Sequence, residues 1–155
     1  MLADFPVTIE YTQVLVYTAS HSAPGLLWTD DHVAQGFAWS NGIVSFGVPD
    51  HDGECRLEVD LADGDVLDPQ ALWAVQVPFQ VTEPLQIGTV FDMRSVKVPI
   101  GRYNLTYQAF PGTDNYAYVL RLTFSHSDAP EFRILKNGGD ITADTVLRRD
   151  AEPAK

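Results

Sequence analysis

The stretch CRLEVDL, residues 55–61, alternates apolar and charged side chains along its whole length. Successive side chains of a β-strand point to opposite faces of the sheet, so the pattern predicts a strand with one buried and one outer face. The buried face would carry Cys55, Leu57, Val59 and Leu61, and the outer face would carry Arg56, Glu58 and Asp60. Within this pattern Cys55 is predicted to be a buried strand residue and not a reactive thiol.

The same alternation recurs along the rest of the chain. It returns at residues 75–81, where Pro78 on the outer face predicts an edge strand or a bulge. From Val7 to Val16 it slips by one residue near Thr12 and Gln13, which predicts a bulge inside one strand. Further strands are expected at residues 44–48, 96–98, 103–107, 116–124 and 132–134.

Turn-forming pairs separate these strands, among them Asn41-Gly42, Asp52-Gly53 and Asp63-Gly64. One helix is predicted, with Thr29 as N-cap and Gly36 as its stop. The predicted fold class is all-β: an antiparallel β-sandwich of about 8–10 strands with one short helix near residues 30–35. Residues 1–155 are expected to form a single domain, with residues from about 140 to 155 as a loosely packed tail.

Size and cysteine content indicate a protein that folds by burial alone. With 155 residues the chain is long enough to bury a core, and Cys55 is its only cysteine, so no internal disulfide can form. The first residues, MLADFPVTIEYT, lack the basic start and apolar run of a secretory signal. No apolar run approaches the roughly 20 residues that span a bilayer. These features predict a cytoplasmic protein without membrane insertion.

Acidic side chains dominate the first part of the chain. Residues 1–93 carry fourteen Asp and Glu against one basic residue, Arg56, and the whole chain has a formal net charge of −11. Eight of the acids fall within residues 50–68. Such a surface repels a phosphate backbone, which excludes direct nucleic-acid binding, and it attracts a basic partner. The alternative is that these charges only keep a β-rich protein soluble.

The sequence contains no recognisable catalytic arrangement. It lacks the G-x-S-x-G elbow, the P-loop and the dinucleotide fingerprint. The four histidines, His21, His32, His51 and His126, show no metal-ligand spacing, and each is expected on the surface or in a loop. We therefore predict no enzyme activity, no catalytic residue, no metal ligand and no cofactor.

The stretch DHDGE, residues 50–54, has an alternative interpretation. Its alternate carboxylates before a glycine resemble part of a calcium loop, although the remaining ligand positions of an EF-hand are missing. A solvated hairpin tip explains the same residues. A calcium- or carbohydrate-binding sandwich module thus remains as a rival function.

Several blocks of sequence resemble the competence protein J (ComJ) family. They are Trp28-Thr29-Asp30, Gly36-Phe37-Ala38, residues 41–46 (NGIVSF), residues 77–83 (VPFQVTE) and residues 98–106 (VPIGRYNLT). The resemblance covers about residues 28–111. It implies an intracellular inhibitor that forms a complex with a DNA-entry nuclease. The acidic stretch from about residue 49 to residue 71 is longer than its equivalent in the family, and no residue of the inhibitory contact is carried over from it.

The leading hypothesis is a nuclease inhibitor that binds and occludes a basic DNase through an acidic surface. Its carboxylates would stand in for phosphates, and Trp28 would supply an apolar anchor, although a packing role is favoured for this residue. The predicted contact residues are Trp28, Asp30, Asp31, Asp50, Asp52, Glu54, Glu58, Asp60, Asp63, Asp65 and Asp68. A second hypothesis is an immunity protein for a bacterial toxin that is not a DNase.

Overall fold

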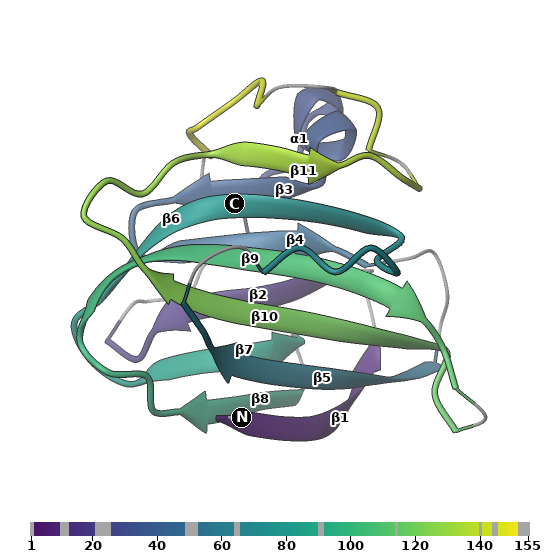
Figure 1. Ribbon diagram of the computed structural model, residues 1–155, viewed down its shortest axis with the longest axis horizontal. Coiled ribbons are helices and arrows are strands. Elements are labelled where there is room, and N and C mark those ends of the chain that lie inside the picture. Colours follow the sequence, from purple (N-terminus) through teal and green to yellow (C-terminus); the bar gives the residue numbers. More distant parts are fainter. Residues whose placement is uncertain are drawn as a thin grey trace.

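The computed structural model describes residues 2–9, 13–20, 26–48, 53–63, 66–89, 92–113, 115–139, 141–143 and 146–151. Two stacked sheets contain the strands of these residues (Figure 1). The six-stranded sheet has the order β1 (Ala3–Ile9), β5 (Gly53–Leu61), β10 (Tyr118–His126), β9 (Gly101–Pro111), β6 (Trp73–Val81) and β11 (Arg133–Lys136). The five-stranded sheet has the order β3 (Phe37–Ser40), β4 (Ile43–Gly47), β2 (Gln13–Thr18), β7 (Leu85–Thr89) and β8 (Asp92–Val96). The all-β sandwich is confirmed, with eleven strands among the described residues where about 8–10 were predicted.

The core fills the space between the two sheets with the inward side chains of both. Phe46 from β4 stacks on Tyr107 from β9 with ring centroids 4.7 Å apart, and the Tyr107 hydroxyl donates to the Gly47 carbonyl at 2.9 Å. This hydrogen bond joins the two sheets directly. The predicted inward residues Cys55, Leu57 and Val59 are buried. Leu61 is exposed, contrary to prediction, because it is the last residue of β5 and lies at the end of the sandwich.

The predicted bulge near Thr12 and Gln13 is wrong, because the chain changes sheets there. Val7 in β1 belongs to the six-stranded sheet, whereas Val14 and Val16 in β2 belong to the five-stranded sheet. All three are fully buried in the same core. When a chain passes from one sheet to the facing sheet, the inward direction reverses, and the sequence pattern slips by one residue without any bulge.

The turn predictions have mixed outcomes. Asn41-Gly42 closes the hairpin between β3 and β4, with Gly42 at a φ of 84°, as predicted. The predicted hairpin at Asp52-Gly53 is wrong, because β4 and β5 lie in different sheets. The turn-forming pair Asp63-Gly64 does not join neighbouring strands either, because β10 and β9 separate β5 from β6. The β5–β6 connection, residues 62–72, is therefore a crossover between two parallel strands, and we call it the strap.

Pro78 lies where β6 has a locally free edge. Strand β11 pairs only with Ala74–Gln76 of β6, so the part of β6 beyond Gln76 has a strand partner on one side only, among the described strands. The Pro78 carbonyl accepts a hydrogen bond from the Trp39 indole nitrogen at 2.8 Å. The edge expected from this proline is thus local, within a strand that is otherwise internal to the sheet.

Helix α1 (Asp30–Gln35) begins and ends where the sequence predicts. Thr29 is its N-cap and Gly36, with a φ of 86°, ends it in the left-handed conformation. The prediction that His32 lies on the surface is wrong, because its ring is buried within this cap. His32 Nδ1 accepts from the Thr29 amide at 2.9 Å, so the ring proton lies on Nε2, which donates to the Asp150 carbonyl at 3.2 Å.

The described residues of the C-terminal segment, 141–143 and 146–151, run beside α1. Fully buried Gln35 accepts from the amides of Leu147 and Arg148, each at 2.9 Å, through Oε1. Its Nε2 donates to the carbonyls of Arg148 and Phe37. One glutamine side chain therefore makes four hydrogen bonds and joins this segment to the helix.

Candidate protein-binding surface

The predicted contact residues do not form one surface. Asp50, Asp52 and Asp65 lie outside the described residues. Two groups remain: an α1 group of Trp28, Asp30 and Asp31, and a β5–strap group of Glu54, Glu58, Asp60, Asp63 and Asp68. In the six-stranded sheet β10, β9 and β6 lie between β5 and β11, and α1 lies beyond β11 (Figure 1).

The strap is held on the outer face of the six-stranded sheet. Gln108 of β9, which is fully buried, accepts from the Asp68 amide at 2.8 Å and donates to the Val66 carbonyl at 3.0 Å. Lys136 of β11 donates to the Ala71 carbonyl at 2.5 Å. These bonds fix the described part of the strap and bring Asp68 close to the outward side chains of β5 and β10.

An alternating row of charges runs from β1 to the strap. Arg56 Nε donates to Asp4 at 2.7 Å, and its Nη2 lies 3.6 Å from Glu58. Arg121 of β10 lies 3.1 Å from Glu58 through Nε and 3.5 Å from Asp68 through Nη1. The Arg56 hydrogen bond holds the pKa of Asp4 below its ordinary value. The row contains three acids and two bases, so most of its charge is compensated internally.

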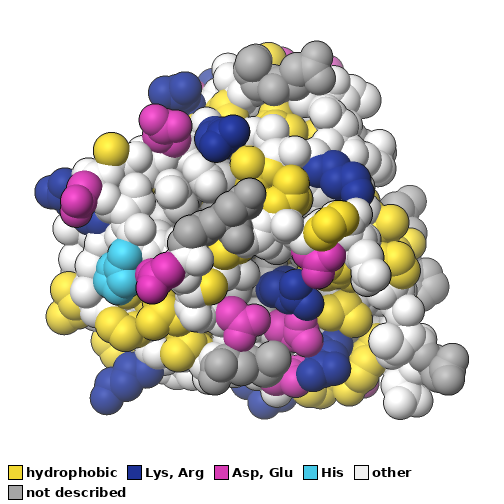
Figure 2. Space-filling view, in the orientation of Figure 1, with side chains coloured by type: hydrophobic (Ala, Val, Ile, Leu, Met, Phe, Trp, Pro, Cys, Tyr) yellow, Lys and Arg dark blue, Asp and Glu magenta, His cyan; other side chains and the backbone are white. Residues whose placement is uncertain are grey.

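Glu58 consequently differs from its prediction. It was expected to present an open carboxylate on the outer face of β5, but it is buried, and two arginines neutralise it. Figure 2 shows basic and acidic side chains interleaved on this face of the molecule, not a patch of one sign. The sequence gives no sign of Arg121, because the parallel pairing of β10 with β5 brings it from 63 residues away.

The more exposed acids of this group lie at opposite ends of β5. Glu54 near its start and Asp63 beyond its end are exposed, whereas Asp60 and Asp68 are half-buried. At about 3.3 Å per residue, Glu54 and Leu61 are already about 23 Å apart. The described acids of residues 54–68 thus form no continuous field.

The α1 group combines exposed acids with exposed apolar side chains. Asp30 and Asp31 are exposed in the first turn of the helix, where their charges suit the helix dipole. Leu27, just before the cap, is 48% exposed, and Val33 on the helix is 44% exposed. These two residues were missed by sequence reasoning. The sequence places Leu27 two residues before the Thr29 cap and Val33 two residues after Asp31, but nothing in this spacing distinguishes them from core residues.

Trp28 is a packing residue with one unusual atom. Its half-buried ring contacts the small core cluster around Leu26 and Ile43 and meets the His32 ring edge-on at 6.2 Å. Its indole Nε1 is buried and has no hydrogen-bond partner in the structure. The packing interpretation of Trp28 therefore has direct support.

A family comparison connects this architecture to known proteins. The family model for competence protein J (ComJ) matches residues 6–125. The chain belongs to the ComJ family. The match covers both sheets up to β10 and includes α1 and the strap.

A solved structure of the family shares this fold. A crystal structure of ComJ from Bacillus subtilis, described as an inhibitor of the DNA-degrading activity of NucA, is 24% identical. The match covers 81% of this chain and 96% of that chain with a TM-score of 0.72. A structure named crocagin biosynthetic gene J is 15% identical, with 78% and 94% coverage and a TM-score of 0.45. No curated protein sequence matches the chain.

Two features are absent from the described residues. No group of three or more His, Cys, Asp or Glu side chains among them could hold a metal ion. Residues 50–54, for which a calcium loop was the rival interpretation, fall mostly outside this part of the chain. No described helix has the length and apolar character needed to cross a bilayer.

Proposed function

We propose that this protein binds a nuclease and blocks its degradation of DNA, without being an enzyme itself. Membership of the ComJ family over residues 6–125 carries the proposal. A ComJ of known structure, from Bacillus subtilis, is an inhibitor of the DNA-degrading activity of NucA. The net charge of −11 supports it, because a basic DNA-binding cleft is attracted to an acidic protein that DNA repels.

The contact is centred, in this proposal, on the α1 group together with Leu27 and Val33. Interfaces that bind tightly combine an apolar centre with polar or charged groups around it. Leu27 and Val33 supply exposed apolar area, and Asp30 and Asp31 supply charges next to it. The arginines in the row from Asp4 to Asp68 make the centre of the β5–strap group less suited to attract a cation.

The predicted acids outside the charge row belong to the edge of the contact. Glu54 and Asp63 are exposed and would contribute mainly to the rate of association. Asp50, Asp52 and Asp65 stay in the proposal on their sequence position alone.

The mechanism would be occlusion of the DNA-binding cleft. Carboxylates at the α1 end would occupy positions that phosphates take in the nuclease–DNA complex, so that DNA and inhibitor compete. Salt screens the attraction between exposed charges, and at physiological salt little of it remains beyond about 8 Å. Inhibition should therefore weaken as the salt concentration increases.

The test is a DNA-degradation assay with purified NucA from Bacillus subtilis and with a nuclease encoded beside this protein's gene. Degradation should fall with increasing inhibitor, reach zero near equimolar amounts and recover as the DNA concentration rises. Added protein that leaves both nucleases fully active, with no complex on a sizing column, would count against the proposal. A heat-unfolded sample serves as the control for non-specific effects of an acidic polypeptide.

A further inference from the structure

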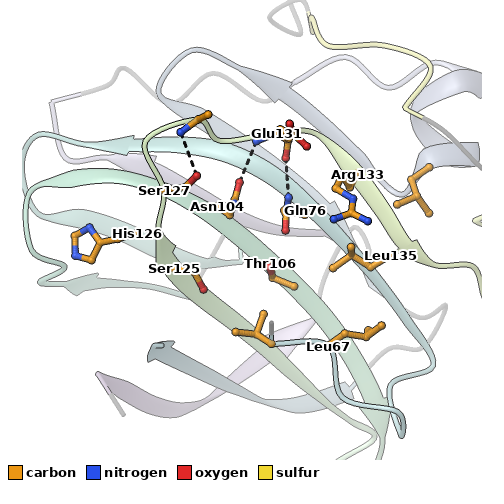
Figure 3. Close-up of a pocket in the computed structure, with 13 residues that line it drawn as sticks. Leu67, Gln76, Asn104, Thr106, Ser125, His126, Ser127, Glu131, Arg133 and Leu135 are labelled. Carbon is orange, nitrogen blue, oxygen red and sulfur yellow. Dashed lines mark hydrogen bonds between the residues drawn. The ribbon is translucent and has the colours of Figure 1, made fainter. Parts of the chain in front are cut away.

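A pocket of about 590 Å³ lies on the outer face of the six-stranded sheet, away from the α1 group. It opens between the strap, at Val66 and Leu67, and the segment that leads into β11 (Figure 3). Its volume falls within the roughly 300–1,000 Å³ range of small-molecule sites. The proposed nuclease contact does not use it.

The floor of the pocket carries two hydroxyl groups without partners. Thr106 of β9 is 1% exposed and Ser125 of β10 is 6% exposed. Both Oγ atoms are buried and have no hydrogen-bond partner in the structure. An unpaired buried hydroxyl is costly, and the two side chains lie on adjacent strands of the pocket floor (Figure 3). A buried hydroxyl without a protein partner calls for one from outside the chain, either a water molecule or a ligand.

Two amide side chains complete the floor and fix one wall. Gln76 Nε2 donates to the Glu131 carbonyl at 3.0 Å, and Asn104 Oδ1 accepts from the Glu131 amide at 3.0 Å. Cross-strand pairing sets Gln76 opposite Thr106 and Asn104 opposite Ser125. Among the contacts of the described residues, the Gln76 amide oxygen and the Asn104 amide nitrogen are left for a ligand. The wall at Glu131 is held in place before any ligand arrives.

The donor and acceptor set defines the ligand class. The floor offers two hydroxyls, which both donate and accept, together with one amide oxygen and one amide nitrogen. This set matches a molecule that also alternates donors and acceptors over short distances. The floor carries no charge, and the charged residues of the pocket, Glu131 and Arg133, are exposed. Leu67 and Leu135 offer apolar surface on the sides to the C–H groups of a ring.

We propose that this pocket binds a neutral, hydroxyl-rich molecule of the size of one or two sugar rings. Thr106 and Ser125 hydrogen-bond its hydroxyl groups at the floor, and Gln76 and Asn104 fix its orientation. The site is independent of the nuclease contact, and its test uses no nuclease.

The experiment is an amide-shift titration of the full chain by NMR with glucose, galactose, N-acetylglucosamine, ribose and maltose. At least one sugar should shift the resonances of Asn104, Thr106 and Ser125 in a saturable manner. No saturable shift with any of the five would overturn the proposal. Acetamide and inorganic phosphate serve as probes of the rival amide and anion classes, and shifts produced by these two alone would also overturn it.

Two variants test whether a sugar binds at the pocket floor. Thr106→Val and Ser125→Ala each remove one hydroxyl at nearly constant volume, and each should weaken sugar binding about tenfold or more. Thr82→Val, at an exposed position outside the pocket, should leave it unchanged. Because the lost hydroxyls are unpaired, both floor variants should keep or raise the thermal midpoint, which separates loss of binding from loss of folding. Sugar affinity that persists in the double variant would contradict the assignment.

Discussion

Arg121 and Glu58 come from parallel neighbouring strands and lie 3.1 Å apart, with the carboxylate buried beneath the outer face of the six-stranded sheet. Arg121 also lies over the Phe110 ring, 4.5 Å from its centroid, which fixes the guanidinium in place. Glu58, which was predicted to attract a partner, therefore contributes to the fold instead.

Removing the arginine should therefore destabilise the protein. Arg121→Gln is expected to lower the free energy of unfolding by about 1–3 kcal/mol, because it leaves a buried carboxylate with only the more distant Arg56. The effect stays below that of a fully buried pair, because the Arg121 side chain is 30% exposed. Urea unfolding measures it. Arg102→Gln, an exposed arginine, is the matched control and should change stability by less than about 0.5 kcal/mol.

Gln35 should hold the described C-terminal segment against α1. Gln35→Ala removes four hydrogen bonds and leaves the amides of Leu147 and Arg148 without their acceptor, so we expect a loss of about 2–4 kcal/mol. Hydrogen exchange should show these two amides losing protection before the strands do. Gln80→Ala, exposed on β6, should have no such effect. Unchanged protection at both amides in Gln35→Ala would mean that the segment is held by other contacts.

The stability of the protein at alkaline pH should depend on the buried phenol of Tyr107. Burial raises the pKa of Tyr107 above its ordinary value, so above about pH 10 the unfolded chain loses this proton while the folded chain keeps it. Stability should therefore fall as pH rises through this window. Tyr107→Phe should cost about 1 kcal/mol at neutral pH, where the bond to Gly47 is lost, and should flatten the alkaline decline. An identical alkaline slope in the variant would show that another group causes it.

Val33 should contribute to nuclease binding and not to folding. Val33→Ala truncates a side chain that is 44% exposed, so we expect a loss of about 1 kcal/mol in binding and little change in stability. Ile100→Ala is the control, because Ile100 is 75% exposed at another place on the surface. Isothermal titration with the nuclease compares the two. Equal losses would indicate a contact not centred on α1.

Local features of this fold were predictable, and its long-range arrangement was not. Alternation identified β5 and β6, and the N-cap and glycine signals placed α1 at its observed bounds, because these depend on residues near in sequence. The sheet change between β1 and β2 looked like a bulge, since both shift the alternation by one residue.

The candidate site was harder to predict for the same reason. Asp30 and Asp31 were identified correctly as exposed charges in the first turn of a helix. The compensation of Glu58 by Arg121 depends on a parallel pairing across 63 residues, which no local pattern reports. The pocket floor depends likewise on the cross-strand pairing that sets Ser125 opposite Asn104.

The most direct test of the proposed contact is the inhibition constant of Asp30→Asn/Asp31→Asn against the cognate nuclease. We expect a loss of about tenfold or more, equivalent to about 1.4 kcal/mol, that shrinks as salt increases. Asp63→Asn/Asp128→Asn removes the same charge from exposed positions elsewhere and should cost less than threefold. Full inhibition by the α1 variant, together with a weakened control, would contradict a contact centred on α1.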